Sequence, residues 1–178
     1  MRSQSGMFIG VMTGTSIDGL DIAAIDIDLE EKIEFIASET IAYPPDLREN
    51  LLALSQAEVA NISFYGGLDA ALGRFIGTSV NRFLRKFGIN PKEVHAIGSH
   101  GQTIRHQPPD TRANGEQSFT LQIGDPNQIA YTTKIITIAD FRRMDIAAGG
   151  QGAPLVPLFH QKILKKQSSD TALVNIGG

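Results

Sequence analysis

The feature that most constrains the fold is a glycine-rich turn near the N-terminus that joins two apolar segments. Residues 7–12 are continuously apolar, and residues 21–29 alternate between apolar and polar side chains. Both patterns are typical of β-strands, the first of a strand that is buried on both faces. Residues 14–19 are therefore predicted to connect two neighbouring strands.

The rest of the chain alternates predicted helices with predicted strands. A third strand at residues 33–42 completes a meander, and a helix is expected after Pro45. The firmest helical pattern places apolar side chains three and four residues apart between Leu68 and Phe87, with Gly88 as the C-terminal cap. Further strands are expected at 94–99, 119–123, 134–139 (buried) and 172–176, helices at 126–132 and 154–166, and a surface loop at 105–118. This order predicts an α/β fold with a mixed sheet and flanking helices.

Composition excludes several classes of protein. Hydrophobic residues make up 42% and charged residues 20%, as in ordinary globular proteins. The formal charge of −3, with dispersed Lys and Arg, gives no basic patch for nucleic acid or an acidic membrane surface. The absence of cysteine rules out disulfides, thiolate metal sites and cysteine nucleophiles. The apolar segment at 7–12 is too short for a membrane span or signal peptide, so a cytoplasmic protein is expected.

The turn at residues 14–19 has the composition of a phosphate-binding loop. Glycines let an anion approach the backbone, and the hydroxyls of Thr15 and Ser16 add donors to the backbone N–H groups. Asp18 and Asp21 could hold Mg²⁺ beside the phosphates, directly or through water. The alternative is an ordinary hairpin, because Asp-Gly is by itself a strong turn signal.

A second polar cluster, at residues 99–103, follows the strand expected at 94–99. It contains His100 and Gln102, and side chains at the end of a strand can converge on a ligand. The alternative is a loop that hydrogen-bonds only to itself. His106 is placed in the surface loop with no evident partner.

The third cluster carries two carboxylates and two guanidiniums at residues 140–145, and a glycine-rich segment follows it. Asp140 and Asp145 could accept hydrogen bonds from sugar hydroxyls, and the guanidiniums, Arg143 among them, could bind an anionic substituent such as a lactyl carboxylate. The alternative is a purely structural ion-pair cluster.

Together these three segments resemble the anhydro-N-acetylmuramic acid kinases, a branch of the sugar kinase, Hsp70 and actin superfamily. The family pattern Gly-Thr-Ser-x-Asp-Gly-x-Asp is similar to residues 14–21, and Gly-Ser-His-Gly-Gln-Thr to residues 98–103. The longest pattern, Asp-Phe-Arg-x-x-Asp-x-Ala-Ala-Gly-Gly-Gln-Gly-Ala-Pro-Leu, is similar to residues 140–155. Three long motifs in the same order make the resemblance specific. Met12 stands where many superfamily members carry an Asp, as it also does in this family.

The resemblance implies a ribonuclease H-like fold, ATP and Mg²⁺ as cofactors, and a role in peptidoglycan recycling and amino sugar catabolism. The implied reaction phosphorylates 1,6-anhydro-N-acetylmuramic acid and opens its anhydro ring with water, which gives MurNAc 6-phosphate. The implied ATP-binding residues are Gly14, Thr15, Ser16, Ile17, Asp18, Gly19, Leu20 and Asp21, with Asp18 also on the metal side. The implied sugar contacts are His100, Gln102, Asp140, Arg143 and Asp145.

The resemblance also implies a division of the chain. Residues 1–170 would form the N-terminal lobe of a two-lobe kinase, and residues 171–178 would begin a C-terminal lobe. The family's general base lies in an Asp-x-Gly-Pro-Gly-Asn segment beyond Gly178, so the 178 residues alone are expected to be inactive. Two alternatives stay open: a truncated, non-catalytic domain that binds sugar or phosphate, and a kinase for another sugar. A homodimer is left open as the assembly.

Overall fold

The structure is a computed structural model that describes residues 5–30, 32–109, 118–164, 172 and 174. Its centre is a five-stranded mixed sheet with the strand order β3-β2-β1-β4-β7. The first three strands form an antiparallel meander, and β4 and β7 continue the sheet parallel to β1. The strands are β1 (Gly6–Thr13), β2 (Leu20–Ile27), β3 (Ile33–Ile41), β4 (Val94–Ser99) and β7 (Thr137–Ile138). The expected α/β class is confirmed, with the mixed sheet of a ribonuclease H-like fold.

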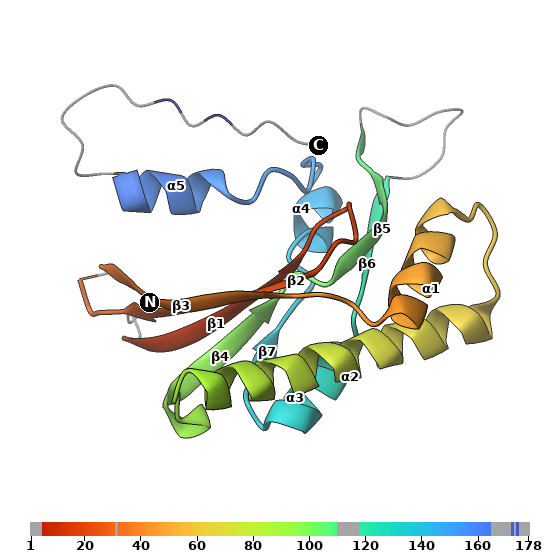
Figure 1. Cartoon of the computed structure of the whole chain (residues 1–178). Helices are drawn as coiled ribbons and strands as arrows, with labels where there is room; N and C mark the ends of the chain where they lie inside the picture. The colour runs from red at the N-terminus through yellow and green to blue at the C-terminus, as the bar shows by residue number, and fades with distance from the viewer. Residues whose placement is uncertain (1–4, 31, 110–117, 165–171, 173, 175–178) are drawn as a thin grey trace.

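Helices α2 (Ile62–Lys86) and α3 (Pro126–Thr133) cover one face of this sheet, and α1 (Pro45–Gln56) lies beside the first half of α2 (Figure 1). Helix α2 begins at its N-cap Asn61, whose side chain accepts from the backbone N–H groups of Ser63 and Phe64. Its apolar residues pack in the core, and Gly88 follows the helix with a φ of 67°, as a left-handed cap requires. The helix predicted from Leu68 to Phe87 is confirmed.

Two glycines set how closely α3 approaches α2. A Cβ at Gly73 would lie 2.5 Å from the carbonyl oxygen of Asp125, and a Cβ at Gly77 would lie 2.8 Å from the Cβ of Thr132. Both separations are too short for real atoms, so the contact between these helices requires glycine at both positions. This packing fixes Asp125, the N-cap of α3, beside the middle of α2.

A two-stranded hairpin corrects one expectation. β5 (Gln102–Gln107) pairs with β6 (Phe119–Ile123), so the predicted surface loop at 105–118 is wrong for its first three residues; residues 110–117 lie outside the description. The pattern did not predict β5 because its residues are mostly polar and only Ile104 is a buried hydrophobic side chain. His106 lies on this strand, where its Nδ1 is 3.0 Å from the Thr120 hydroxyl, so it does have a partner.

The buried strand predicted at 134–139 is confirmed only in part, because the observed strand is shorter and exposed. Only Thr137 and Ile138 pair with β4, and this short strand forms the edge of the sheet. Ile135 is buried, but Ile136 and Ile138 are 70% and 53% exposed. The apolar sequence predicted buried side chains, but this strand lies at the edge of the sheet, where its side chains stay partly exposed.

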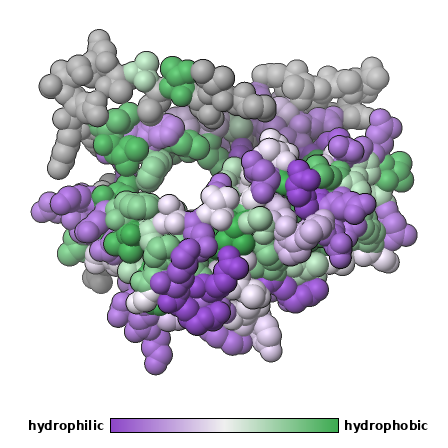
Figure 2. All heavy atoms as spheres, in the orientation of Figure 1, coloured by the Kyte–Doolittle hydropathy of each residue, from purple (hydrophilic) through white to green (hydrophobic). Residues whose placement is uncertain are grey.

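Helix α5 (Pro157–Leu164) lies on the opposite side of the sheet from α2 (Figure 1). It is shorter than the predicted 154–166, and none of its residues is buried. An open, mostly apolar groove of about 880 Å³ separates it from the meander, and apolar side chains gather along it in Figure 2. The strand expected at 172–176 falls largely outside the described residues. No helix in the described part of the chain is long and apolar enough to cross a membrane.

Candidate functional site

The turn at residues 14–19 is not a two-residue Asp-Gly hairpin. Thr13 pairs with Leu20, so six residues connect β1 and β2, and the tight turn lies earlier, where the Ile17 N–H donates to the Gly14 carbonyl at 3.2 Å. Ile17 has a φ of 53°, whereas neither Asp18 nor Gly19 has the positive φ that a type I′ turn needs. The tight turn of this hairpin is therefore not formed by Asp18 and Gly19, and the choice between a phosphate-binding loop and an ordinary hairpin stays a prediction.

The buried side chain of Ile17 anchors this loop. Ile17 is 1% exposed, while Thr15, Ser16 and Asp18 are exposed. One apolar residue points into the core, and the hydroxyls and the carboxylate face solvent. This arrangement leaves polar groups available for a phosphate or its metal ion.

The loop is tied to the second cluster by buried hydrogen bonds. The amide of Gln102, which is 0% exposed, donates to the Gly14 carbonyl at 3.1 Å and to the Thr103 carbonyl at 3.2 Å. The Thr13 hydroxyl donates to the Gly101 carbonyl at 2.9 Å. Gln102 thus supports the loop from below, and its predicted contact with sugar stays a prediction because the side chain is fully buried here.

Tyr43 lies beneath the same loop. Burial raises the pKa of its hydroxyl to about 12; the nearby Thr13 hydroxyl opposes this rise, and the charges of Asp18 and Asp21 add to it. Among the described residues its hydroxyl has no hydrogen-bond partner of acceptable geometry. Tyr43 therefore remains neutral at physiological pH and presents no charge to the loop.

The acidic residues of the loop do not form a metal site by themselves. Asp18 is exposed, and Asp21 accepts from the Thr40 hydroxyl at 2.6 Å. The described residues contain no cluster of three or more His, Cys, Asp or Glu side chains that could hold a metal ion. One or two carboxylates fit Mg²⁺ only when phosphate oxygens and water complete its six ligands.

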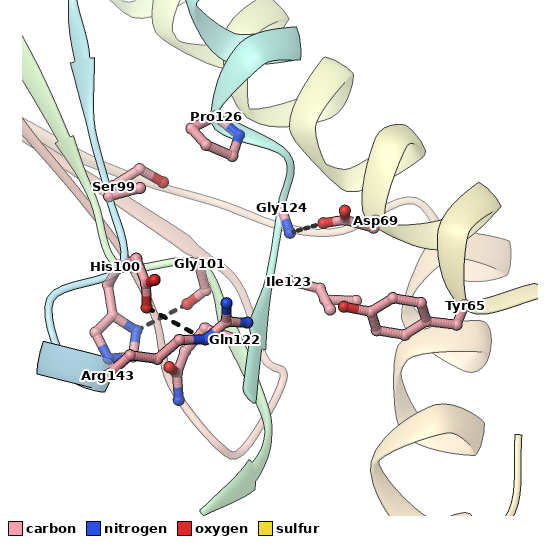
Figure 3. Close-up of a pocket in the computed structure, with 12 residues that line it drawn as sticks. Tyr65, Asp69, Ser99, His100, Gly101, Gln122, Ile123, Gly124, Pro126 and Arg143 are labelled. Atoms are coloured by element: carbon pink, nitrogen blue, oxygen red, sulfur yellow. Dashed lines mark hydrogen bonds and ion pairs between the residues drawn. The ribbon is translucent and has the colours of Figure 1, made fainter. Parts of the chain in front are cut away.

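A cleft of about 210 Å³ opens at the end of β4, lined by Ser99, His100 and Gly101 (Figure 3). The loop follows β1 and His100 follows β4; these strands are parallel neighbours, so both segments lie at the same edge of the sheet. The cleft contains three predicted sugar residues, His100, Asp140 and Arg143, but not Gln102 or Asp145. Its other lining residues are Tyr65, Asp69, Ser99, Gly101, Gln122, Ile123, Gly124, Pro126 and Ala139.

The cleft also contains polar side chains that the sequence reasoning missed. Asp69 and Tyr65 reach it from α2, opposite His100 and Arg143 (Figure 3). The Asp69 carboxylate accepts from the Gly124 N–H at 2.6 Å. Ser99 Oγ and Gln122 Oε1 are buried, and neither has a partner among the described residues. Groups left unpaired in this way are suited to a ligand that supplies hydroxyl or amide partners.

One sequence signal could have indicated Asp69. This carboxylate lies directly beside Leu68 on α2, close to the helix face that packs in the core. Acidic residues at such positions usually have a specific partner. No comparable signal distinguishes Tyr65 or Gln122.

His100 is held on both ring nitrogens. Its Nε2 accepts a hydrogen bond from the Nε–H of Arg142 at 2.7 Å, and its Nδ1 lies 2.8 Å from the Gly101 carbonyl. Arginine can only donate, so Nε2 must be unprotonated and Nδ1 must carry the proton. Burial lowers the pKa of His100; the Gly101 carbonyl opposes this shift, and the charge of Arg142 adds to it. The neutral ring is therefore favoured.

The charged residues of the third cluster differ in what they contact. Arg143 forms an exposed ion pair with Asp140 at 3.5 Å, whereas burial lowers the pKa of Arg142, which also donates to the Gly152 carbonyl at 2.5 Å. The Asp145 carboxylate accepts from the Gly152 N–H at 2.6 Å. Asp145 thus holds the glycine segment (residues 149–152) and lies outside the cleft lining, so its predicted sugar contact stays a prediction.

Comparison with known proteins gives a consistent result. A family model described as anhydro-N-acetylmuramic acid kinase matches residues 6–178. The anhydro-N-acetylmuramic acid kinase of Shewanella frigidimarina is 49% identical over 99% of this chain and 46% of that protein. The enzymes of that name from Vibrio vulnificus (46% identical; 99% of this chain, 46% of that protein) and Coxiella burnetii (48%; 96% and 44%) are similar to the same extent. The chain spans less than half the length of these curated relatives.

Among solved structures, RuvC from Thermus thermophilus is similar with a TM-score of 0.40 and 15% sequence identity. The superposition covers 93% of this chain and 85% of that one.

Proposed function

Because the chain belongs to the anhydro-N-acetylmuramic acid kinase family, we propose that it provides the phosphate loop and one wall of the sugar site of such a kinase. The reaction is ATP-dependent phosphorylation of 1,6-anhydro-N-acetylmuramic acid with hydrolytic opening of the anhydro ring, which gives MurNAc 6-phosphate. The supporting observation is the buried link from Gln102 and Thr13 between the loop and the segment that contains His100.

For the nucleotide, we assign residues 14–21 to the ATP phosphates. Thr15 and Ser16 carry exposed hydroxyls, and the exposed Asp18 carboxylate fits a Mg²⁺ ion that arrives with ATP. Bound Mg·ATP would supply the phosphoryl group and neutralise charge that develops during its transfer. The buried Ile17 holds the loop so that its exposed groups keep one arrangement.

For the sugar, the cleft supplies neutral and charged partners. Ser99 Oγ and Gln122 Oε1 are suited to hydroxyl or acetamido groups, because they are buried without partners. Arg143 lies in the cleft wall with an exposed guanidinium, which suits the lactyl carboxylate that distinguishes muramic acid from other amino sugars. Asp140 would accept a hydroxyl hydrogen bond once a carboxylate competes for Arg143.

The assignment leaves one role unfilled. Deprotonation of the attacking water requires a general base, and we assign that role to none of these residues. The proposed division into a lobe of residues 1–170 and the start of a second lobe at 171–178 remains a prediction.

Calorimetry and a coupled ADP assay test the proposal on this chain. We expect 1,6-anhydro-N-acetylmuramic acid and Mg·ATP each to bind, with the sugar preferred over N-acetylglucosamine and glucose, and without ADP release. A preference for glucose or N-acetylglucosamine would favour a kinase for another sugar. Absence of binding to both ligands would contradict the proposal.

The alternative of a non-catalytic binding domain needs a different measurement. A chain extended to the length of the relatives should release ADP with Mg·ATP and the anhydro sugar. Binding without turnover in that longer chain would favour the binding domain.

A further inference from the structure

Two adjacent arginines differ in what they contact. Arg143 forms an exposed ion pair with Asp140, in which both side chains are more than half exposed. Arg142 is part-buried, and its guanidinium donates to two acceptors from distant parts of the chain, His100 Nε2 at 2.7 Å and the Gly152 carbonyl at 2.5 Å. Exposed pairs contribute little, whereas a guanidinium that bridges two acceptors fixes their relative positions.

We propose that Arg142 is a positioning residue that holds His100 in its Nδ1-protonated neutral form and joins this ring to the glycine segment. The chemical basis is that a guanidinium N–H requires an acceptor, so it selects the tautomer whose Nε2 carries a lone pair. The remaining ring proton on Nδ1 is then directed to the Gly101 carbonyl.

This arrangement has a consequence for the cleft. With both nitrogens engaged, His100 offers a sugar the carbon edge of its ring and acts as a rigid wall. Proton transfer through His100 would require Arg142 to move away first. The importance of this wall for sugar binding rests on the proposed function, but the tautomer and the attachment of Gly152 do not.

Long-range ¹H–¹⁵N NMR of the histidine side chains tests the assignment without any ligand. In the wild-type chain His100 should show the Nδ1-protonated tautomer. In Arg142→Met the population should move toward the Nε2-protonated form, and the Gly152 amide signal should shift. Arg142→Lys, which keeps the charge but has one donor centre, should restore the tautomer only in part.

A matched control is available in Arg105. This arginine is also part-buried, and its guanidinium donates to the Ala57 carbonyl, in a part of the fold outside the cleft lining. Arg105→Met should leave the His100 signals unchanged. An unchanged His100 tautomer in a folded Arg142→Met chain, or an equal change in Arg105→Met, would overturn the proposal.

Sugar titration then separates the positioning role from the proposed function. In Arg142→Met the Kd for 1,6-anhydro-N-acetylmuramic acid should rise about tenfold, and the Kd for Mg·ATP should change less than twofold. If the wild type binds the sugar and Arg142→Met binds it with the same Kd, Arg142 does not position the cleft wall for sugar binding. If the wild type binds no sugar, the proposed sugar site fails, and the NMR result still decides whether Arg142 sets the tautomer.

Discussion

Two glycine-containing connections of this chain are held by different forces. The proposed phosphate loop (residues 14–19) is anchored by Ile17, which is 1% exposed, and by the fully buried Gln102. The glycine segment (residues 149–152) is held by the exposed Asp145 and the part-buried Arg142. The presence of glycine therefore does not determine how a connection is held in the fold. The first loop is anchored in the core by Ile17, whereas the second is held by charged side chains that are at least partly exposed.

The two connections should differ most in the loss of stability that follows when an apolar side chain packed at each is truncated to alanine. Ile17→Ala should lower the free energy of unfolding by about 2–4 kcal/mol, because it opens a cavity beneath the phosphate loop. Ile146→Ala, which removes the partly buried side chain beside Gly152, should have a clearly smaller effect. Urea denaturation measures both, and equal losses would remove the distinction.

The second test removes the buried polar support of the phosphate loop. Gln102→Leu should cost about 1–3 kcal/mol, since the Gly14 and Thr103 carbonyls lose a donor. It should also weaken Mg·ATP binding more than sugar binding. The exposed Gln56→Leu serves as the control and should change the unfolding free energy very little. A Gln102→Leu chain that is as stable as the wild type would show that this support is dispensable.

The third test acts on the glycine segment. Asp145→Ala should cost about 1 kcal/mol, because the N–H of the buried Gly152 loses its carboxylate partner. Asp140→Asn alters only an exposed ion pair and should cost less. Hydrogen exchange of the Gly152 amide should accelerate in the first variant and not in the second; unchanged exchange would contradict the role of Asp145.

The fourth test uses pH. Burial lowers the pKa of His100 in the folded chain. As the pH falls below about 6.5, the ordinary pKa of histidine, the His100 ring is therefore protonated in the unfolded chain before it is protonated in the folded chain. Stability from the neutral ring is complete above that pH and is lost as the pH falls from it toward the lower folded pKa. The stability advantage of wild type over His100→Gln should therefore shrink between pH 7.5 and 5.5. If the stability advantage of the wild type instead grows as the pH falls, the pKa of His100 is not lowered in the folded chain.

The smallest effect on stability is expected at Asp18. Asp18→Asn should change the free energy of unfolding by less than about 0.5 kcal/mol, because the side chain is exposed. It should nevertheless weaken Mg·ATP binding at least tenfold. Glu34 is an exposed carboxylate on β3, away from the loop, so Glu34→Gln should change neither the free energy of unfolding nor the binding of Mg·ATP. Parallel losses of stability and binding in Asp18→Asn would favour a structural role.

Elements with strong periodicity were predictable from sequence, and elements defined by their partners were not. The apolar pattern identified β1, β2 and α2, because each buries the face that its spacing defines. The polar strand β5 was missed because its pairing with β6 leaves most of its side chains partly exposed. β7 was predicted too long because an apolar run does not reveal that it lies at an edge.

The site shows the same limit. Sequence placed His100, Asp140 and Arg143 together, and the cleft contains all three. The sequence could not distinguish Arg142 from Arg143, because these neighbours at the start of helix α4 (Arg143–Ala147) have different contacts. It also could not place Asp69, which reaches the cleft from a helix more than thirty residues away along the chain.

The positions of the tyrosines give the protein a built-in optical probe. The chain has three tyrosines and no tryptophan, so its intrinsic fluorescence comes from tyrosine alone. Tyr43 lies beneath the phosphate loop, Tyr65 lines the cleft, and Tyr131 is 75% exposed with Lys134 over its ring. Single replacements by phenylalanine would therefore assign the emission change caused by nucleotide to one ring and that caused by sugar to another, without any attached label.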